Sequence, residues 1–111
     1  SDKRYLAVKE QTGLCAADFF PLFPEADLIL LEGQKYSSYP KLELVRREIG
    51  GQPVCPRETV LAYVTDWTDE GGRPCLRGAE VPVFGFDEVE RIAAFAVDFM
   101  DGEARRGGLE L

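Results

Sequence analysis

The chain has 111 residues, of which 45% are hydrophobic and 30% charged, with a formal net charge of -7 at pH 7 and no histidine. This length fits one small domain, and the acidic balance disfavours binding to nucleic acid polymers or anionic membranes, which need a basic face. The lack of histidine excludes Ser-His and Cys-His catalytic pairs and every His-ligated metal. We expect neither a membrane span nor a signal peptide. The three cysteines, Cys15, Cys55 and Cys75, have no CxxC spacing, which favours reduced thiols in the cytoplasm.

The first third of the chain predicts a strand, a helix and a second strand. Residues 4–9 alternate loosely and predict a short strand. Thr12 is the expected N-cap of a helix that ends near Phe20, because Pro21 does not continue a helix. Residues 27–31 end in four consecutive apolar side chains, a pattern typical of a parallel strand that is covered on both faces. This order predicts a right-handed crossover unit.

The sequence predicts three further strands after residue 40. Residues 41–46 alternate and predict a strand with Leu42 and Leu44 on one face and a wetter face opposite. Its pairing with the preceding strand could be antiparallel or could involve a crossover, and the sequence leaves this open. Residues 59–64 predict a buried strand, and residues 81–84 predict a short final one.

The chain closes with a helix that starts near Asp87. Glu90 stands three residues later, which is a capping-box arrangement. Residues 68–80 predict a mobile surface loop, and residues 102–111 predict a frayed tail, so we expect one α/β domain over residues 1–101. The apolar side chains expected to face the sheet are Val89, Ile92, Ala93, Phe95, Ala96, Val97, Phe99 and Met100.

Glu32 and Gly33 end the apolar run at 27–31. Parallel sheets bind ligands outside the carboxyl ends of their strands. A carboxylate there is similar to the acidic residue of a Walker B strand, which holds Mg²⁺, usually through water; a purely structural acid is the alternative. Gly33 allows the close approach of a backbone or phosphate, or simply serves the turn. Lys35 and Lys41 could reach a phosphate, although a solvated surface lysine is the ordinary role.

Two ordered motifs carry a family resemblance. Asp-Leu-Ile-Leu-Leu-Glu-Gly-x-Lys at 27–35 and Pro-Lys-Leu-Glu-Leu-x-Arg at 40–46 resemble the molybdopterin-guanine dinucleotide biosynthesis protein B (MobB) family of GTP-binding P-loop proteins. The similarity continues at Val64-Thr65-Asp66 and from Val81 through Phe95. It implies an α/β fold with a mostly parallel sheet flanked by helices, P-loop NTPase-like, and it implies GTP and Mg²⁺ as ligands. The implied nucleotide-binding residues are Glu32, Gly33, Lys35, Thr65 and Asp66, with Glu32 at the metal.

Within this resemblance, Thr65 and Asp66 match a shortened guanine-recognition motif. The carboxylate accepts hydrogen bonds from guanine N1 and N2, which are both donors. An N-cap or turn role for Asp66 is the alternative. Trp67 could stack on a base, but shielding of the sheet edge is favoured. Arg46 and Arg47 could bind a phosphate or a pterin-type anion, although an exposed pair at a strand end is the default.

The phosphate-binding signature Gly-x-x-x-x-Gly-Lys-Ser/Thr is absent from the sequence. The family carries it near the N-terminus, so the resemblance covers the later portion only and implies an incomplete fold. We expect a piece of a longer protein or a short relative, with a homodimer or another chain completing the sheet. The implied function is a GTP-binding adapter, a weak GTPase at most, beside a MobA-like molybdenum cofactor nucleotidyltransferase. The alternatives are a non-enzymatic dimerisation or docking domain of a molybdoenzyme assembly factor, and an unrelated α/β enzyme with Glu32 as base.

Overall fold

The computed structural model of the chain describes residues 20–33 and 36–105. The chain divides into two units, one ending at Leu31 and one beginning at Glu32. The strand predicted at 4–9, the helix predicted from Thr12 and the side chain of Lys35 lie outside the described residues.

In the first unit, the predicted strand at 27–31 is not formed. A 3₁₀ helix spans Phe20–Leu22, but residues 28–31 belong to neither a helix nor a strand. Their side chains are exposed, that of Leu30 by 84%. The prediction is therefore wrong for this structure. A run of apolar residues favours burial, but a strand also needs neighbouring strands to bond its backbone, and no described residue pairs with this segment.

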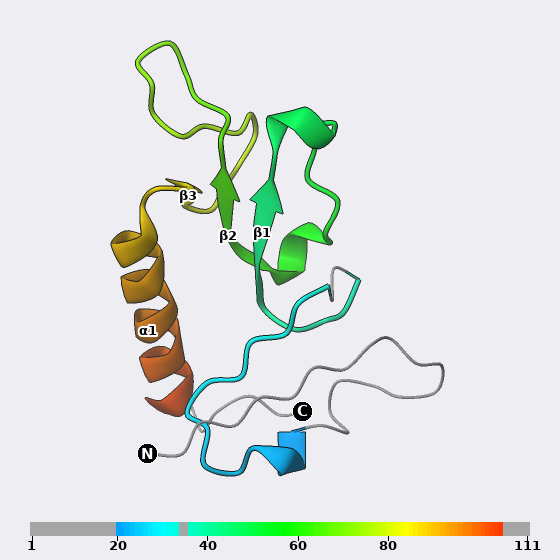
Figure 1. Cartoon of the computed structure of the whole chain (residues 1–111), viewed down its shortest axis with the longest axis vertical. Coiled ribbons are helices and arrows are strands. Elements are labelled where there is room, and N and C mark those ends of the chain that lie inside the picture. Colours follow the sequence, from blue (N-terminus) through cyan, green and yellow to red (C-terminus); the bar gives the residue numbers. More distant parts are fainter. Residues whose placement is uncertain (1–19, 34–35, 106–111) are drawn as a thin grey trace. The chain divides into compact units, whose positions relative to one another are not determined.

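The second unit contains a parallel sheet of three strands, β1 (Lys41–Val45), β2 (Val60–Thr65) and β3 (Val83–Gly85), in the order β1-β2-β3. All three strands were predicted, with small shifts of their ends. Both pairs are parallel, so the chain crosses over between β1 and β2 and again between β2 and β3. Figure 1 shows the arrows of β1 and β2 pointing the same way.

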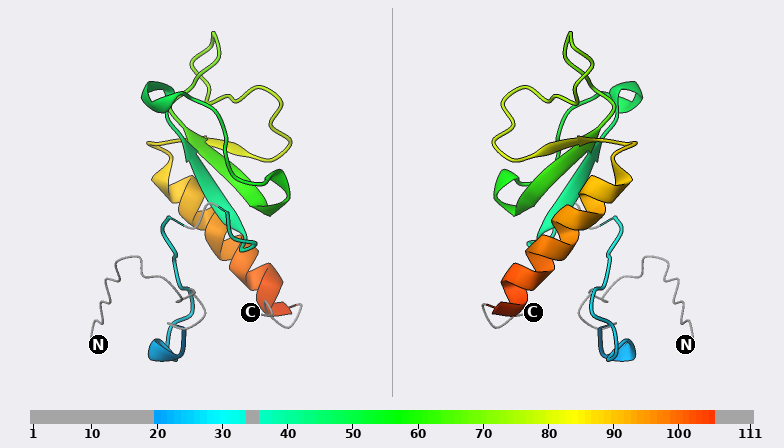
Figure 2. Two further views of the ribbon diagram at one scale, coloured as in Figure 1. Left: turned by 90° about the vertical axis from the view of Figure 1, so that its right-hand side faces the viewer. Right: turned by 90° about the vertical axis from the view of Figure 1, so that its left-hand side faces the viewer.

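Helix α1 (Val89–Arg105) covers one face of this sheet (Figures 1 and 2). Ile92 and Phe95 pack against the buried cluster Ala62, Val64 and Phe84. Val89 and Val97 are 66% and 58% exposed and Ala93 is exposed as well, so the predicted apolar stripe is correct at Ile92 and Phe95 but too wide. The helix continues to Arg105, beyond the predicted start of the tail.

The other face of the sheet is covered by the connections between the strands. Val45, Val60 and Tyr63 form its core, and Cys55, Leu76, Ala79, Val81 and Val83 pack around them. Burial and the nearby Glu43 carboxylate raise the pKa of the Tyr63 phenol above 10.0. The 3₁₀ turns Arg47–Ile49 and Arg57–Thr59 belong to the connection that crosses from β1 to β2.

The face of β1 that was predicted to be wetter is the more deeply buried one, although Leu42 on the opposite face packs against the cluster under α1. Glu43, expected on the wetter face, is only 6% exposed, whereas Leu44 is 62% exposed. The carboxylate of Glu43 accepts hydrogen bonds from the backbone N–H of Val54 at 2.6 Å and of Cys55 at 3.3 Å. An ionised side chain can be buried when backbone donors replace its water. Binary hydrophobic patterning misses such a residue.

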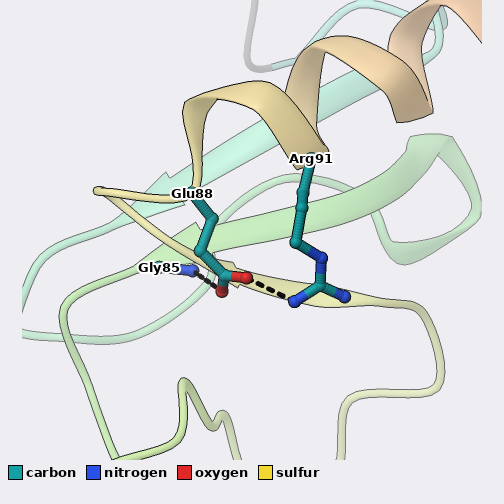
Figure 3. Close-up of polar contacts among 3 residues, drawn as sticks. All are labelled: Gly85, Glu88 and Arg91. Atoms are coloured by element: carbon teal, nitrogen blue, oxygen red, sulfur yellow. Dashed lines mark hydrogen bonds and ion pairs between the residues drawn. The ribbon is translucent and has the colours of Figure 1, made fainter.

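The start of α1 also differs from the prediction. The backbone N–H of Ile92 donates to the Glu88 carbonyl at 3.0 Å, so Glu88 rather than Asp87 stands immediately before the helix. The Glu88 carboxylate turns back, accepts from the Gly85 N–H at 2.9 Å and pairs with Arg91 (Figure 3). The Gly85 hydrogen bond, with help from Arg91, lowers the pKa of Glu88. The carboxylate therefore fastens the end of β3 to the first turn of the helix.

The α/β class is thus confirmed, as a small parallel sheet with a helix on one face. Among the described residues, no helix is long and apolar enough to cross a membrane.

Candidate functional site

The three strands end level with one another. The register pairs Val45 with Thr65, and Thr65 with Gly85. The next residue of each strand is therefore found in one row, with Arg46 after β1, Asp66 after β2 and Phe86 after β3. All three are exposed. This row, which we call the carboxyl edge, lies where parallel sheets bind ligands.

Asp66 is held at this edge by one of its two oxygens. Its Oδ1 accepts a hydrogen bond from the Arg47 backbone N–H at 2.9 Å. This bond secures the turn that follows β1, so the turn role that the sequence left open is present. Within the described residues, Oδ2 accepts no hydrogen bond, and a carboxylate oxygen has two acceptor positions. Asp66 is therefore fixed in place and still has acceptor capacity directed to solvent.

Thr65 supports Asp66 from inside the sheet. Its side chain is 1% exposed. The hydroxyl donates to the Val45 carbonyl at 2.7 Å and accepts from the Trp67 N–H at 3.1 Å. These bonds tie the ends of β1 and β2 to the turn that contains Asp66. Because the hydroxyl is buried, its contribution to any ligand site is to position Asp66.

Two arginine–aromatic pairs flank Asp66. The guanidinium carbon of Arg46 lies 5.9 Å from the centroid of the Phe86 ring, and that of Arg47 lies 5.4 Å from the Trp67 ring. Trp67 also packs on the backbone at Gly51, where an added Cβ would lie 2.6 Å from the indole. Trp67 is therefore enclosed by protein on two sides, which agrees with the shielding role favoured by the sequence.

An apolar groove opens beside the carboxyl edge, on the face that carries α1. Its volume is about 450 Å³. Leu44 and Val64 are paired in the register and line it, and Arg46 and Phe86 belong to both the groove and the edge. We did not predict this groove from the sequence, although the alternation of Leu42 and Leu44 was a signal for an apolar face. The complete lining is Leu42, Leu44, Arg46, Val64, Phe86 and Ile92.

The other predicted site residues lie apart from this edge. Glu32 is exposed and precedes the amino end of β1, and no hydrogen bond or ion pair joins it to Thr65 or Asp66. Gly33 has φ of +81° with open space around it, as a turn glycine does. The described residues contain no group of three or more Cys, Asp or Glu side chains that could hold a metal ion. A lone carboxylate such as Glu32 holds Mg²⁺ only together with phosphate oxygens and water.

Lys41, the other lysine considered as a phosphate ligand, is committed to the protein. Its ammonium donates to the carbonyls of Ser37 at 2.6 Å and Tyr39 at 2.9 Å and to the hydroxyl of Thr59 at 3.1 Å. These are the three hydrogen bonds that an ammonium can make. Lys41 therefore anchors the loop at the amino end of β1.

Comparisons with models of protein families, with curated proteins and with solved structures find no match to this chain.

Proposed function

We propose that the chain is a MobB-like, GTP-binding adapter of molybdenum cofactor biosynthesis, in which it serves the formation of molybdopterin guanine dinucleotide. The observation that supports this best is the position of Asp66, a held carboxylate with a free acceptor oxygen at the carboxyl edge of a parallel sheet. The motifs at 27–35 and 40–46 are the second support.

The chemistry of Asp66 favours guanine over adenine. Guanine presents two adjacent donors, N1–H and the N2 amino group, to a carboxylate that only accepts. Adenine presents an acceptor at N1, so the same carboxylate would meet a lone pair. A site built from polar groups rejects a ligand that leaves them unpaired. Thr65 and Arg47 hold Asp66 before the ligand arrives, which reduces the cost of ordering the site.

The phosphate end of the nucleotide is assigned by resemblance. By resemblance, Glu32 would contribute to a Mg²⁺ ion held mainly by phosphate oxygens, with Gly33 and Lys35 beside it in the sequence. This part of the proposal comes from the sequence motif alone, because Glu32 precedes the amino end of β1 and no described hydrogen bond or ion pair joins it to Asp66. Since the sequence has no phosphate-binding signature, we assign base recognition to this chain and do not assign GTP hydrolysis to it. The proposed role is an adapter that presents a guanine nucleotide to a MobA-like nucleotidyltransferase in the cytoplasm.

A homodimer is part of the proposal. Among the described residues, β1 pairs with β2 alone, so its other edge is open, and Leu44 on β1 is 62% exposed. An open strand edge with apolar side chains favours association with another strand. Sedimentation velocity over a wide concentration range tests this. We expect a mass that rises to twice the monomer, and a monomer at every concentration would contradict the dimer.

The test of base recognition is a titration of the ¹⁵N-labelled chain with GMP, followed by amide NMR shifts. We expect millimolar binding, because no phosphate loop contributes, and no comparable binding of AMP. In Asp66→Asn the amide oxygen still accepts, but its NH₂ group faces a guanine donor. GMP binding should weaken about 10- to 100-fold.

The same substitution should strengthen the binding of a different nucleotide, xanthosine monophosphate. Xanthosine monophosphate has a carbonyl at position 2, and the side-chain amide of the Asp66→Asn variant can donate a hydrogen bond to it. Asp66→Asn should therefore bind xanthosine monophosphate more tightly than the natural chain does. Asp98→Asn, an equal change of charge on the exposed side of α1, is the control. An absence of GMP binding by the natural chain, or unchanged GMP binding by Asp66→Asn, would overturn the proposed function.

A further inference from the structure

We infer that the carboxyl edge binds a planar ring edge-on to Asp66, with one face of the ring on Phe86 and the other under Arg46. The inference deepens the proposed function and rests on it, because the ring is the guanine base. It assigns Phe86 and Arg46 as the residues that hold the base.

The order of the strands determines where Asp66, Arg46 and Phe86 lie along the carboxyl edge. Asp66 follows the central strand, and Arg46 and Phe86 follow the strands on either side. Neighbouring strands are about 4.8 Å apart, so the two outer positions are separated by about 10 Å of backbone. A ring that stands between their side chains presents its edge to Asp66.

The space between Arg46 and Phe86 is close to what a ring requires. A flat ring in contact on both faces needs about 7 Å between the groups on either side. The guanidinium carbon of Arg46 now lies 5.9 Å from the Phe86 centroid. An outward movement of about 1 Å therefore admits the ring. Arg46 is exposed, and the contact that this movement breaks is its contact with Phe86. The bound ring would replace the cation–π contact between Arg46 and Phe86 with two stacking contacts, one with each side chain.

The groove supplies an apolar wall below this position. Leu44 and Val64 are adjacent across β1 and β2 and line the groove that Arg46 and Phe86 also line. Asp66 does not line the groove, so this wall would contact the apolar part of the ring, while the hydrogen bonds to Asp66 form at the exposed edge. The sugar and the phosphates would leave through the open mouth of the groove.

Trp67 is the other aromatic residue at this edge, but it is not available in the same way. Its ring packs on Gly51 and lies beside Arg47. The two rings are equally exposed, at 38% each, but only Phe86 lines the groove, and it does so just after β3. The two side chains therefore have different roles, with Trp67 closing the edge and Phe86 facing the ligand.

The test compares Phe86→Leu with the natural chain in GMP titrations by NMR. Leucine keeps an apolar side chain but removes the aromatic face, and we expect binding to weaken about tenfold. A structural role alone would not move the second readout, the upfield ring-current shift of the GMP H8 proton in the bound state. That shift should be present with the natural chain and lost with Phe86→Leu.

Two further variants keep the test decisive. Phe86→Tyr retains the ring and should retain both binding and the H8 shift, even if Phe86→Leu fails to fold. Arg46→Gln should weaken GMP binding several-fold, whereas Arg77→Gln, the same charge change in the exposed β2–β3 connection, should not. Wild-type GMP affinity in Phe86→Leu, with binding still lost in Asp66→Asn, would overturn this inference and leave the proposed function standing. No GMP binding by the natural chain would instead overturn the proposed function.

Discussion

The two ends of the sheet treat their charged side chains differently. At the amino end, the Lys41 ammonium makes three hydrogen bonds to protein oxygens, and inside β1 the Glu43 carboxylate accepts from two backbone amides. At the carboxyl end, Asp66 uses one oxygen, and Arg46 and Phe86 are exposed beside it. Lys41 and Glu43 are therefore satisfied by the protein, whereas Asp66 keeps acceptor capacity that the proposed ligand would use.

The largest expected effect is at Glu43. Glu43→Ala removes the acceptor for the Val54 and Cys55 amides and leaves a gap on the buried face of β1. We expect the free energy of unfolding to fall by about 2 kcal/mol, measured by urea denaturation. Glu58→Ala, at an exposed position in the same connection, should change it by less than about 0.5 kcal/mol. Equal losses in the two variants would contradict a structural role specific to Glu43.

The next largest loss of stability is expected for substitution of Gly51. Its φ is +64°, and an added Cβ would lie 2.6 Å from the Trp67 ring. Gly51→Ala should lower the free energy of unfolding by about 1–2 kcal/mol. It should also change the fluorescence of Trp67, the one tryptophan in the chain. Gly50 has a similar φ of +79° but open space, so Gly50→Ala carries the backbone strain alone. A Trp67 spectrum that changes equally in both variants would contradict the proposed packing.

Substitution of Asp66 should have the opposite balance of effects to substitution of Glu43. Asp66→Asn keeps an oxygen for the Arg47 amide, so the free energy of unfolding should change by less than about 1 kcal/mol. The same substitution should weaken GMP binding by the larger factor given above. Thermal or urea unfolding of the variant is the measurement. A loss of stability as large as that of Glu43→Ala would show that Asp66 is a structural residue of the same kind.

The smallest effect is the pH dependence at Glu88. The folded state lowers the pKa of this carboxyl below 4.5, chiefly through the Gly85 amide. The contribution of Glu88 to stability is therefore complete above this pH and is lost as the pH falls through the folded-state pKa. The difference in urea midpoint between the natural chain and Glu88→Gln should be present at pH 7 and shrink at acidic pH. A difference that grows on acidification would have the opposite sign and contradict the role of Glu88.

Local patterns predicted the parts of the fold that local chemistry decides. The alternation at 41–46 and the β-branched residues near Val60 and Val64 predicted their strands, and the apolar repeat around Ile92 and Phe95 predicted α1. Pairing between strands is not local. The resemblance implied a mostly parallel sheet, but the residue-by-residue register and the row formed by Arg46, Asp66 and Phe86 came only from the structure.

Two failures have the same physical origin. The run at 27–31 has the composition of a buried strand, but composition does not supply the neighbouring strand that would bond it. Glu43 has the character of a surface residue, but its residue type does not show that the Val54 and Cys55 amides meet it. Of the candidate site, the sequence singled out Asp66 and favoured the shielding role of Trp67. It missed Phe86, whose proposed role depends on its place opposite Arg46.

A map of the amide shifts that GMP induces in the natural chain shows directly whether the carboxyl edge binds guanine. We predict saturable shifts at Arg46, Arg47, Asp66 and Phe86, with little change at Lys41 and Thr59 at the opposite end of the sheet. Shifts centred on the amino end, or none at millimolar GMP, would contradict the claim that the carboxyl edge is a guanine site.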